Sequence, residues 1–159
     1  MTKTNAMRLL EKSKISYSTV EYEVDENDLS GQHVAQQLLQ PCESVFKTLV
    51  VKGQKQGYNV CCIPVNEELD MKKVAKIIKD KKVEMIPVKD LLKVTGYIRG
   101  GCSPIGMKKH FPTYFHESVL EQSEIAISAG VRGMQIMIEP SILLEFLGAK
   151  HADLIKRDE

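Results

Sequence analysis

The 159-residue sequence lacks the features that define several large classes of protein. It has no apolar run close to the roughly 18 residues that a membrane-spanning helix needs. Its opening, MTKTNAMRLLEKSK, has no apolar region of the kind found in signal peptides, so we expect a cytoplasmic protein. Lysine and arginine number 22 against 21 acidic residues. The net charge of +1 gives no general attraction toward nucleic acid, and a polyanion would have to find a local basic patch.

The common signatures of metal and nucleotide sites are also missing. None of the four cysteines forms a C-x-x-C pair, which predicts reduced thiols rather than zinc ligands or a redox pair. The histidines have no suitably spaced partners, so we expect no metal, and we expect no other cofactor. Neither G-x-x-x-x-G-K-[ST] nor G-x-G-x-x-G occurs, which argues against the ordinary nucleotide-binding folds.

The composition that is present suits a globular protein. Hydrophobic residues make up 43% and charged residues 27%, and the sequence has no repeats, low-complexity segments or linker, so we expect residues 1–159 to form a single domain. Hydrophobic periodicity predicts helices over 4–13, 32–39, 71–79, 88–94 and 142–147. Alternating or continuous apolar runs predict strands over 16–24, 45–51, 58–65, 82–87, 113–116, 124–128 and 134–139.

The order of these elements indicates the fold class. Strands come mostly in pairs and helices at irregular intervals, so we predict an α+β fold. We expect a mixed, mostly antiparallel sheet or open barrel flanked by helices, not a doubly wound parallel sheet. Thr4 or Asn5, Ser30 and Asp70 are predicted N-caps, and Gly148 is predicted to close the last helix. The tail, KHADLIKRDE, is amphipathic and is expected to pack or fray.

Residues 95–109, TGYIRGGCSPIGMKK, hold four of the ten glycines and one of the six prolines. Glycines this dense allow positive φ and let another group approach the main-chain N–H donors. The stretch predicts either a tight corner between strands or a cradle for an oxygen-rich ligand. Backbone donors of Gly100 and Gly101, with the Ser103 hydroxyl, could bind a carbonyl oxygen or a developing oxyanion.

Lys47 is the most informative single residue. In VFKTLVV, alternation places Lys47 on one face with Val45, Leu49 and Val51, and Thr48 on the other. A lysine with apolar neighbours on the same face of a strand lies at the edge of the sheet, extends to solvent or projects into a cleft. An edge lysine is the plain interpretation, whereas a desolvated lysine can anchor an anion or act as an activated amine.

Three other features have a plain and a functional interpretation. Ser128 precedes Ala129-Gly130 and could line the same cleft, or could only form a turn. Cys102 lacks a basic neighbour that would activate it, so a packing role is favoured over a nucleophile. The lysines of residues 72–82 are typical of a solvated helix face, although they could also follow a phosphate backbone.

Three segments carry a pattern that can be recognised as a family: VFKTLVV at 45–51, LDMKKVAKIIKDKKVEMIP at 69–87 and TGYIRGGCSPIGMKK at 95–109. In order and spacing they resemble the YbaK family, which includes EbsC-type proteins, over nearly the whole chain. These are free-standing relatives of the editing domain inserted in prolyl-tRNA synthetases. The resemblance implies a mixed sheet or barrel flanked by helices, and a trans-editing deacylase whose best-known substrate is Cys-tRNA(Pro).

The resemblance also assigns roles to residues. It places the family's central lysine on Lys47, with Thr48 beside it, and the G-x-x-x-P loop that holds the aminoacyl end on Gly100 to Pro104. A tyrosine of an early strand falls on Tyr22 and a serine of a small-residue turn on Ser128. Two positions depart from the pattern: Ser30 follows Leu29 where some relatives have an aromatic residue, and Gln135 replaces an aspartate and cannot carry its charge.

These motifs contain no strong protein nucleophile or general base. We therefore expect Lys47 to anchor the terminal nucleotide and polarise the ester, with water or the substrate's own thiol as the attacking group. A thiol route would make the enzyme a lyase. The expected partners are the acceptor end of aminoacyl-tRNA and prolyl-tRNA synthetase. The alternatives are a deacylase for another small amino acid such as alanine, a non-catalytic accessory protein that binds the tRNA or the synthetase, and an unrelated structural domain.

Overall fold

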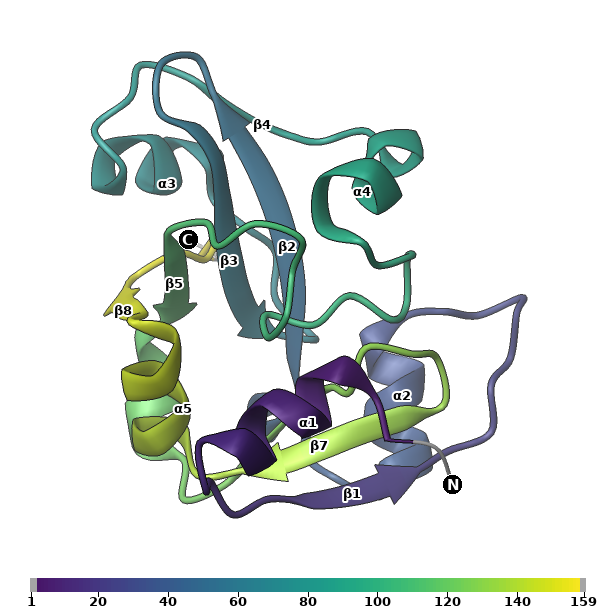
Figure 1. Cartoon of the computed structure of the whole chain (residues 1–159). Helices are drawn as coiled ribbons and strands as arrows, with labels where there is room; N and C mark the ends of the chain where they lie inside the picture. The colour runs from purple at the N-terminus through teal and green to yellow at the C-terminus, as the bar shows by residue number, and fades with distance from the viewer. Residues whose placement is uncertain (1–2, 158–159) are drawn as a thin grey trace.

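The computed structural model describes residues 3–157 and confirms the predicted α+β fold. The strands are divided between two sheets that do not close into a barrel (Figure 1). One sheet has the order β1-β7-β6 and the other the order β4-β2-β3-β5-β8. The strands are β1 (Ser18–Glu21), β2 (Phe46–Gly53), β3 (Gly57–Pro64), β4 (Val83–Met85), β5 (Thr113–His116), β6 (Ile125–Ser128), β7 (Met134–Ile138) and β8 (Lys150–Ala152).

Local signals in the sequence mark several of the helix ends. They are α1 (Asn5–Lys12), α2 (Gly31–Leu38), α3 (Met71–Ile77), α4 (Val88–Thr95) and α5 (Pro140–Leu147), with 3₁₀ turns at Cys42–Ser44 and Glu117–Glu121. The side chains of Thr4, Ser30 and Asp70 accept hydrogen bonds from the first turns of α1, α2 and α3. Gly148 ends α5 with a φ of 63°. The predicted caps are therefore confirmed.

The β2–β3 hairpin is the centre of the five-stranded sheet. Its two strands pair along their whole length, from Phe46 opposite Pro64 to Gly53 opposite Gly57. The predicted alternation in β2 is confirmed: Phe46 and Val50 enter one hydrophobic cluster, whereas Val51 enters a second one with Leu49 packed against it. The β3–β5 and β5–β8 pairs are parallel, and the other strand pairs described are antiparallel.

The three-stranded sheet meets β2 at the beginning of that strand. Val45, just before β2, forms a parallel bridge with Ala126 of β6. Helix α1 lies across this sheet in Figure 1 and contributes Ala6, Met7 and Leu10 to the largest core cluster. The two sheets therefore join at a seam beside the N-terminal end of β2, which is where Lys47 and Thr48 lie.

The tail packs against the body of the protein. Strand β8 pairs with β5, Leu154 is fully buried, and Ile155 bridges to Leu69. Lys73 of α3 holds the tail through an ion pair of 2.9 Å between its Nζ and Asp153 Oδ2 and a hydrogen bond of 2.8 Å from the same Nζ to Ile155 O. At least one lysine of the predicted solvated helix face thus has a structural role. Residues 158–159, the last of the predicted tail, lie outside the described part of the chain.

The helices of this fold are short. Within residues 3–157, none combines the length and the apolar character that crossing a membrane requires.

Candidate active site

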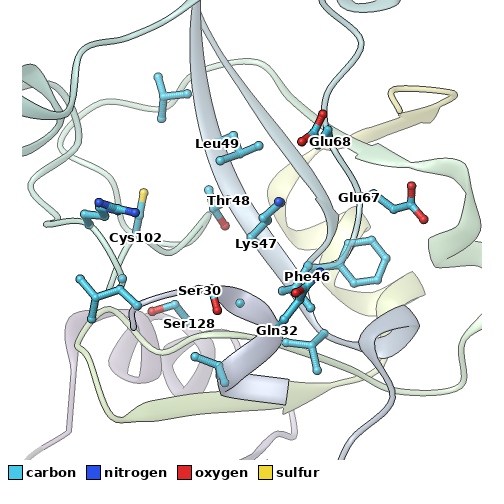
Figure 2. A pocket seen from close by; sticks show the side chains of 18 of the residues that line it. Ser30, Gln32, Phe46, Lys47, Thr48, Leu49, Glu67, Glu68, Cys102 and Ser128 are labelled. Carbon is cyan, nitrogen blue, oxygen red and sulfur yellow. The ribbon is translucent and has the colours of Figure 1, made fainter. Parts of the chain in front are cut away.

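A cavity of about 720 Å³ opens at the seam between the two sheets (Figure 2). Its wall draws on the start of α2, the first half of β2, the loop after β3, the end of β4, helix α4, the glycine-rich loop and the β6–β7 pair. Of the residues predicted for the site, the wall includes Lys47, Thr48, Gly100, Ser128 and Gln135. Residues far apart in the sequence therefore meet in one place.

The cavity exists because one edge of β2 has no strand partner along its first half. Strand β4 pairs only with Val51, Lys52 and Gly53, and Ile86 N donates a hydrogen bond of 3.1 Å to Val50 O. In an antiparallel strand, alternate residues direct their N–H and C=O to the same edge. Thr48, two residues before Val50, therefore directs both backbone groups to the open edge and toward the cavity.

Lys47 and Thr48 point to opposite sides of β2, as Figure 2 shows. The Lys47 side chain is half-buried, and Lys47 forms no ion pair with any other residue of the described range 3–157. Burial lowers the pKa of its ammonium group, and the carboxylates of Glu68 and Glu67 partly oppose this shift. Lys47 is thus a cation without a counter-ion in contact, facing a cavity large enough for a ligand.

The glycine-rich loop offers fewer donors than the sequence suggested. Gly101 N donates a hydrogen bond of 3.0 Å to Ile98 O, so this amide is already used. The Ser103 hydroxyl is fully buried and accepts a hydrogen bond of 3.2 Å from Ile105 N. Neither Gly101 nor Ser103 lines the cavity. Gly100, in contrast, belongs to the wall, and its amide finds no acceptor within the described part of the chain.

Cys102 lines the cavity on the side of Thr48 (Figure 2). Burial raises the pKa of its thiol to about 12. The thiol is therefore neutral at pH 7, and the thiolate is the nucleophilic form of cysteine. This environment supports the interpretation of Cys102 as a packing residue.

Ser128 and Gln135 lie opposite each other in the β6–β7 pair. The Ser128 hydroxyl accepts a hydrogen bond of 3.1 Å from Gly130 N, as expected for a turn. Gln135 is 5% exposed, and its Oε1 has no hydrogen-bond partner among the described residues. A buried acceptor without a donor is costly, and this one belongs to a residue of the cavity wall.

Tyr22, another predicted site residue, does not join this arrangement. It follows β1, packs against a cluster that includes Ala35 and Met137, and its backbone N donates a hydrogen bond of 2.9 Å to Gly133 O. It does not line the cavity.

The wall also contains charged residues that the sequence did not single out. Glu67 and Glu68 follow β3 and lie on the side of Lys47, and Arg99 comes directly before Gly100. Of these three residues, only Arg99 could have been located from the sequence, because it stands next to the paired glycines at 100 and 101. Within the described residues, no group of three or more histidine, cysteine or acidic side chains could hold a metal ion.

Comparison with known proteins agrees with this geometry. Residues 27–146 match the family described as aminoacyl-tRNA editing domain. The chain is 49% identical to a protein of Enterococcus faecalis that carries the provisional name Cys-tRNA(Pro)/Cys-tRNA(Cys) deacylase EbsC, over 98% of this chain and 95% of that protein. It is 32% identical to a proline–tRNA ligase of Fervidobacterium nodosum over 52% of this chain and 14% of the ligase.

Solved structures show the same fold at lower identity. One, provisionally described as a trans-editing enzyme for prolyl tRNA synthetase, superposes with a TM-score of 0.83 at 22% identity and covers 98% of this chain and 100% of its own. A second, of a hypothetical protein, superposes with a TM-score of 0.85 at 17% identity, with 94% and 97% covered. From the family match and the relative at 49% identity, we conclude that the chain belongs to the aminoacyl-tRNA editing domain family.

Proposed function

We propose that this protein is a trans-editing deacylase that removes a mischarged small amino acid from tRNA, chiefly cysteine from Cys-tRNA(Pro). In this proposal the chain acts as one editing domain, within which residues 27–146 match the family. One observation carries the proposal: three residues with unpaired polar groups, namely Lys47 with its ammonium, Gly100 with its amide and Gln135 with its Oε1, all belong to the wall of one cavity of the described chain. The name of the relative at 49% identity supports cysteine as the amino acid.

Each of these three groups suits a different part of an aminoacyl-tRNA end. The Lys47 ammonium attracts a phosphate of the terminal nucleotide. The Gly100 N–H donates to the ester carbonyl oxygen, where negative charge develops during attack. The Gln135 side chain, which belongs to the cavity wall, hydrogen-bonds an ammonium or hydroxyl group of the substrate, and the backbone of Thr48 can hold the extended end along the open edge of β2.

The attacking group comes from outside the protein in this mechanism. The thiol of Cys102 is protonated at neutral pH, and the described wall of the cavity contains no histidine. In hydrolysis, a water oxygen bonds to the carbonyl carbon, the ester C–O bond breaks, and the ribose oxygen takes up a proton. If the substrate's thiol attacks instead, its sulfur bonds to the same carbon, its proton passes to the ribose oxygen, and the amino acid leaves as a thiolactone.

The direct test is a deacylation assay with purified protein. Cys-tRNA(Pro), Ala-tRNA(Pro) and Pro-tRNA(Pro) are each incubated with the wild type and with Lys47→Ala, and the released product is identified by mass spectrometry. We expect cleavage of Cys-tRNA(Pro) that exceeds cleavage of the other two and is lost in Lys47→Ala. Binding of Cys-tRNA(Pro) without cleavage above the Lys47→Ala background would overturn the proposal and identify a non-catalytic accessory protein.

A further inference from the structure

The peptide between Arg99 and Gly100 occupies the centre of a tight turn. Gly101 N donates to Ile98 O, which closes a four-residue turn with Arg99 and Gly100 in the middle. Gly100 has a φ of 85°, and Arg99 is absent from the non-glycine residues of positive φ. A turn with positive φ at its third residue and not at its second is a type II turn.

The direction of this peptide decides what the loop presents to the cavity. A trans peptide is planar, with its C=O and N–H on opposite sides. Type I and type II turns differ chiefly by a rotation of their central peptide, and glycine at the third position permits both. If the peptide turned over, the Arg99 carbonyl would replace the Gly100 N–H, and a hydrogen-bond donor in the wall would become an acceptor.

Arg132 holds the carbonyl side of this peptide. Its Nε donates a hydrogen bond of 2.8 Å to Arg99 O, and its side chain packs on Gly100, where a Cβ atom would lie 3.2 Å from Nε. Arg132 comes from the β6–β7 turn and does not line the cavity, whereas Gly100 does. The carbonyl therefore points toward Arg132, and the Gly100 N–H points to the opposite side.

The two turns are packed closely at this point, which gives the contact a fixed geometry. A Cβ atom on Gly101 would lie 3.2 Å from the backbone of Val131. The ring of Tyr97 lies against Gly130, and its hydroxyl donates a hydrogen bond to Ile105 O. Arg132 takes part in no ion pair with the described acidic residues, so no carboxylate among them competes for its guanidinium.

We propose that Arg132 is a positioning residue, which fixes the Arg99–Gly100 peptide so that the Gly100 N–H faces the substrate carbonyl. The inference rests on the proposed deacylase function and assigns to Arg132 a part in it. Without Arg132, Arg99 O has no other partner among residues 3–157, and the type II turn loses the contact that selects it. The Gly100 N–H then faces the cavity in only a fraction of the molecules.

Variants at position 132 distinguish two roles for Arg132: orienting the Arg99–Gly100 peptide, and contributing a positive charge. Arg132→Met keeps the aliphatic stem and removes the donor, and removing an oxyanion donor lowers kcat by about 10²–10³-fold. Because the turn is loosened and the donor itself remains, we expect kcat for Cys-tRNA(Pro) to fall about ten- to a hundred-fold with little change in KM. Arg132→Gln can still donate to Arg99 O and should recover much of kcat. Arg8→Met, on the exposed face of α1, is the matched control and should behave as wild type.

A structural measurement makes the test independent of catalysis. The crystal structure of Arg132→Met should show Gly100 with a negative φ, or two orientations of the 99–100 peptide, within an unchanged fold. A retained φ near 85° with normal kcat overturns the inference. So does a rise in KM that disappears at high salt while kcat is unchanged, because that result identifies a phosphate contact. Failure of the wild type to cleave any aminoacyl-tRNA would overturn the proposed function, whereas the orientation of the peptide would still be tested.

Discussion

At the scale of single residues, Lys47 combines a half-buried position with the absence of an ion pair among residues 3–157. Its pKa is lowered on folding, so the unfolded chain binds the proton more tightly. The charge therefore costs stability at neutral pH, and this cost disappears as the pH rises from the folded pKa toward 10.5. A group kept at the expense of stability is typical of a functional site.

Lys47→Met should therefore stabilise the protein and abolish deacylation. The methionine keeps most of the aliphatic stem and needs no solvation, and each kcal/mol gained would raise Tm by about 2–4 °C. Thermal unfolding at pH 7 measures the effect, which should shrink as the pH approaches the pKa of the unfolded lysine. Lys55→Met, at an exposed position of the β2–β3 hairpin, should leave Tm unchanged. A lower Tm for Lys47→Met would mean that the charged group is stabilising.

Glu67 and Glu68 should set the upper pH limit for binding. Both carboxylates raise the pKa of Lys47, so their removal lowers it further. In the double variant Glu67→Gln/Glu68→Gln, affinity for a non-hydrolysable 3′-amide analogue of Cys-tRNA(Pro) should be lost at a lower pH than in the wild type, because the ammonium loses its proton earlier. Binding titrations from neutral to alkaline pH measure this shift. An unchanged alkaline limit would show that Lys47 does not carry the binding.

Cys102 should be dispensable although it lines the cavity. Its thiol pKa of about 12 leaves almost no thiolate at pH 7. We expect Cys102→Ala to change kcat/KM by less than about threefold, which is under ~0.7 kcal/mol. Iodoacetamide at pH 7 should leave the wild type active. Rapid inactivation with loss of activity in Cys102→Ala would instead identify a nucleophile.

At the scale of elements, the turn at Gly100 places a backbone position of positive φ, which suits glycine, in the cavity wall. With a φ of 85°, alanine at this position costs about 1–2 kcal/mol, and its Cβ would press on Arg132 Nε at 3.2 Å. Gly100→Ala should therefore lower both Tm and kcat, and bulkier residues should block the reaction. Tm and steady-state kinetics measure the two effects.

Gly57→Ala is the matched control for this experiment. Gly57 has a φ of 67° on a hairpin away from the cavity, and a Cβ atom added to it would meet no described atom within 4 Å. It should lose similar stability and keep full activity. If both variants kept normal kcat, the Gly100 turn would not be part of the site.

Elements specified by neighbouring residues could be predicted from the sequence. The caps at Thr4, Ser30 and Asp70 depend on contacts two or three residues away, and the faces of β2 follow from simple alternation. Strand β8 was expected only as a tail that packs or frays, because its partner β5 lies more than thirty residues earlier. Its strand character depends on that distant edge.

The site shows the same division between local and distant information. The direction of Lys47 follows from the β2 pattern, and the Gly100 loop could be located from its glycines. Which amides of that loop stay free could not be predicted, because Gly101 N is used by Ile98 O inside the turn. The placement of Tyr22 outside the wall depends on how the two sheets meet, which no local pattern encodes.

At the scale of the whole molecule, the weak net charge bears on how tRNA is reached. With a net charge of +1, the protein has little general electrostatic attraction for a polyanion. We expect prolyl-tRNA synthetase, which holds the tRNA, to raise kcat/KM for Cys-tRNA(Pro) by about tenfold or more by raising the local concentration. Assays with and without the synthetase measure this effect, with another aminoacyl-tRNA synthetase as the control. Equal kcat/KM under all three conditions would show that the protein finds tRNA alone.

The Gly100 donor belongs to the main chain, and this has a consequence for how the protein can change over time. A point mutation can replace any side chain of the cavity wall, but it cannot delete a backbone N–H unless it introduces proline. Residues such as Gln135 or Cys102 can therefore be exchanged, and the choice of amino acid can drift, while the donor that we propose to polarise the ester is inherited with the fold. The fold itself tolerates such drift, since solved structures at 17% and 22% identity superpose with TM-scores of 0.85 and 0.83.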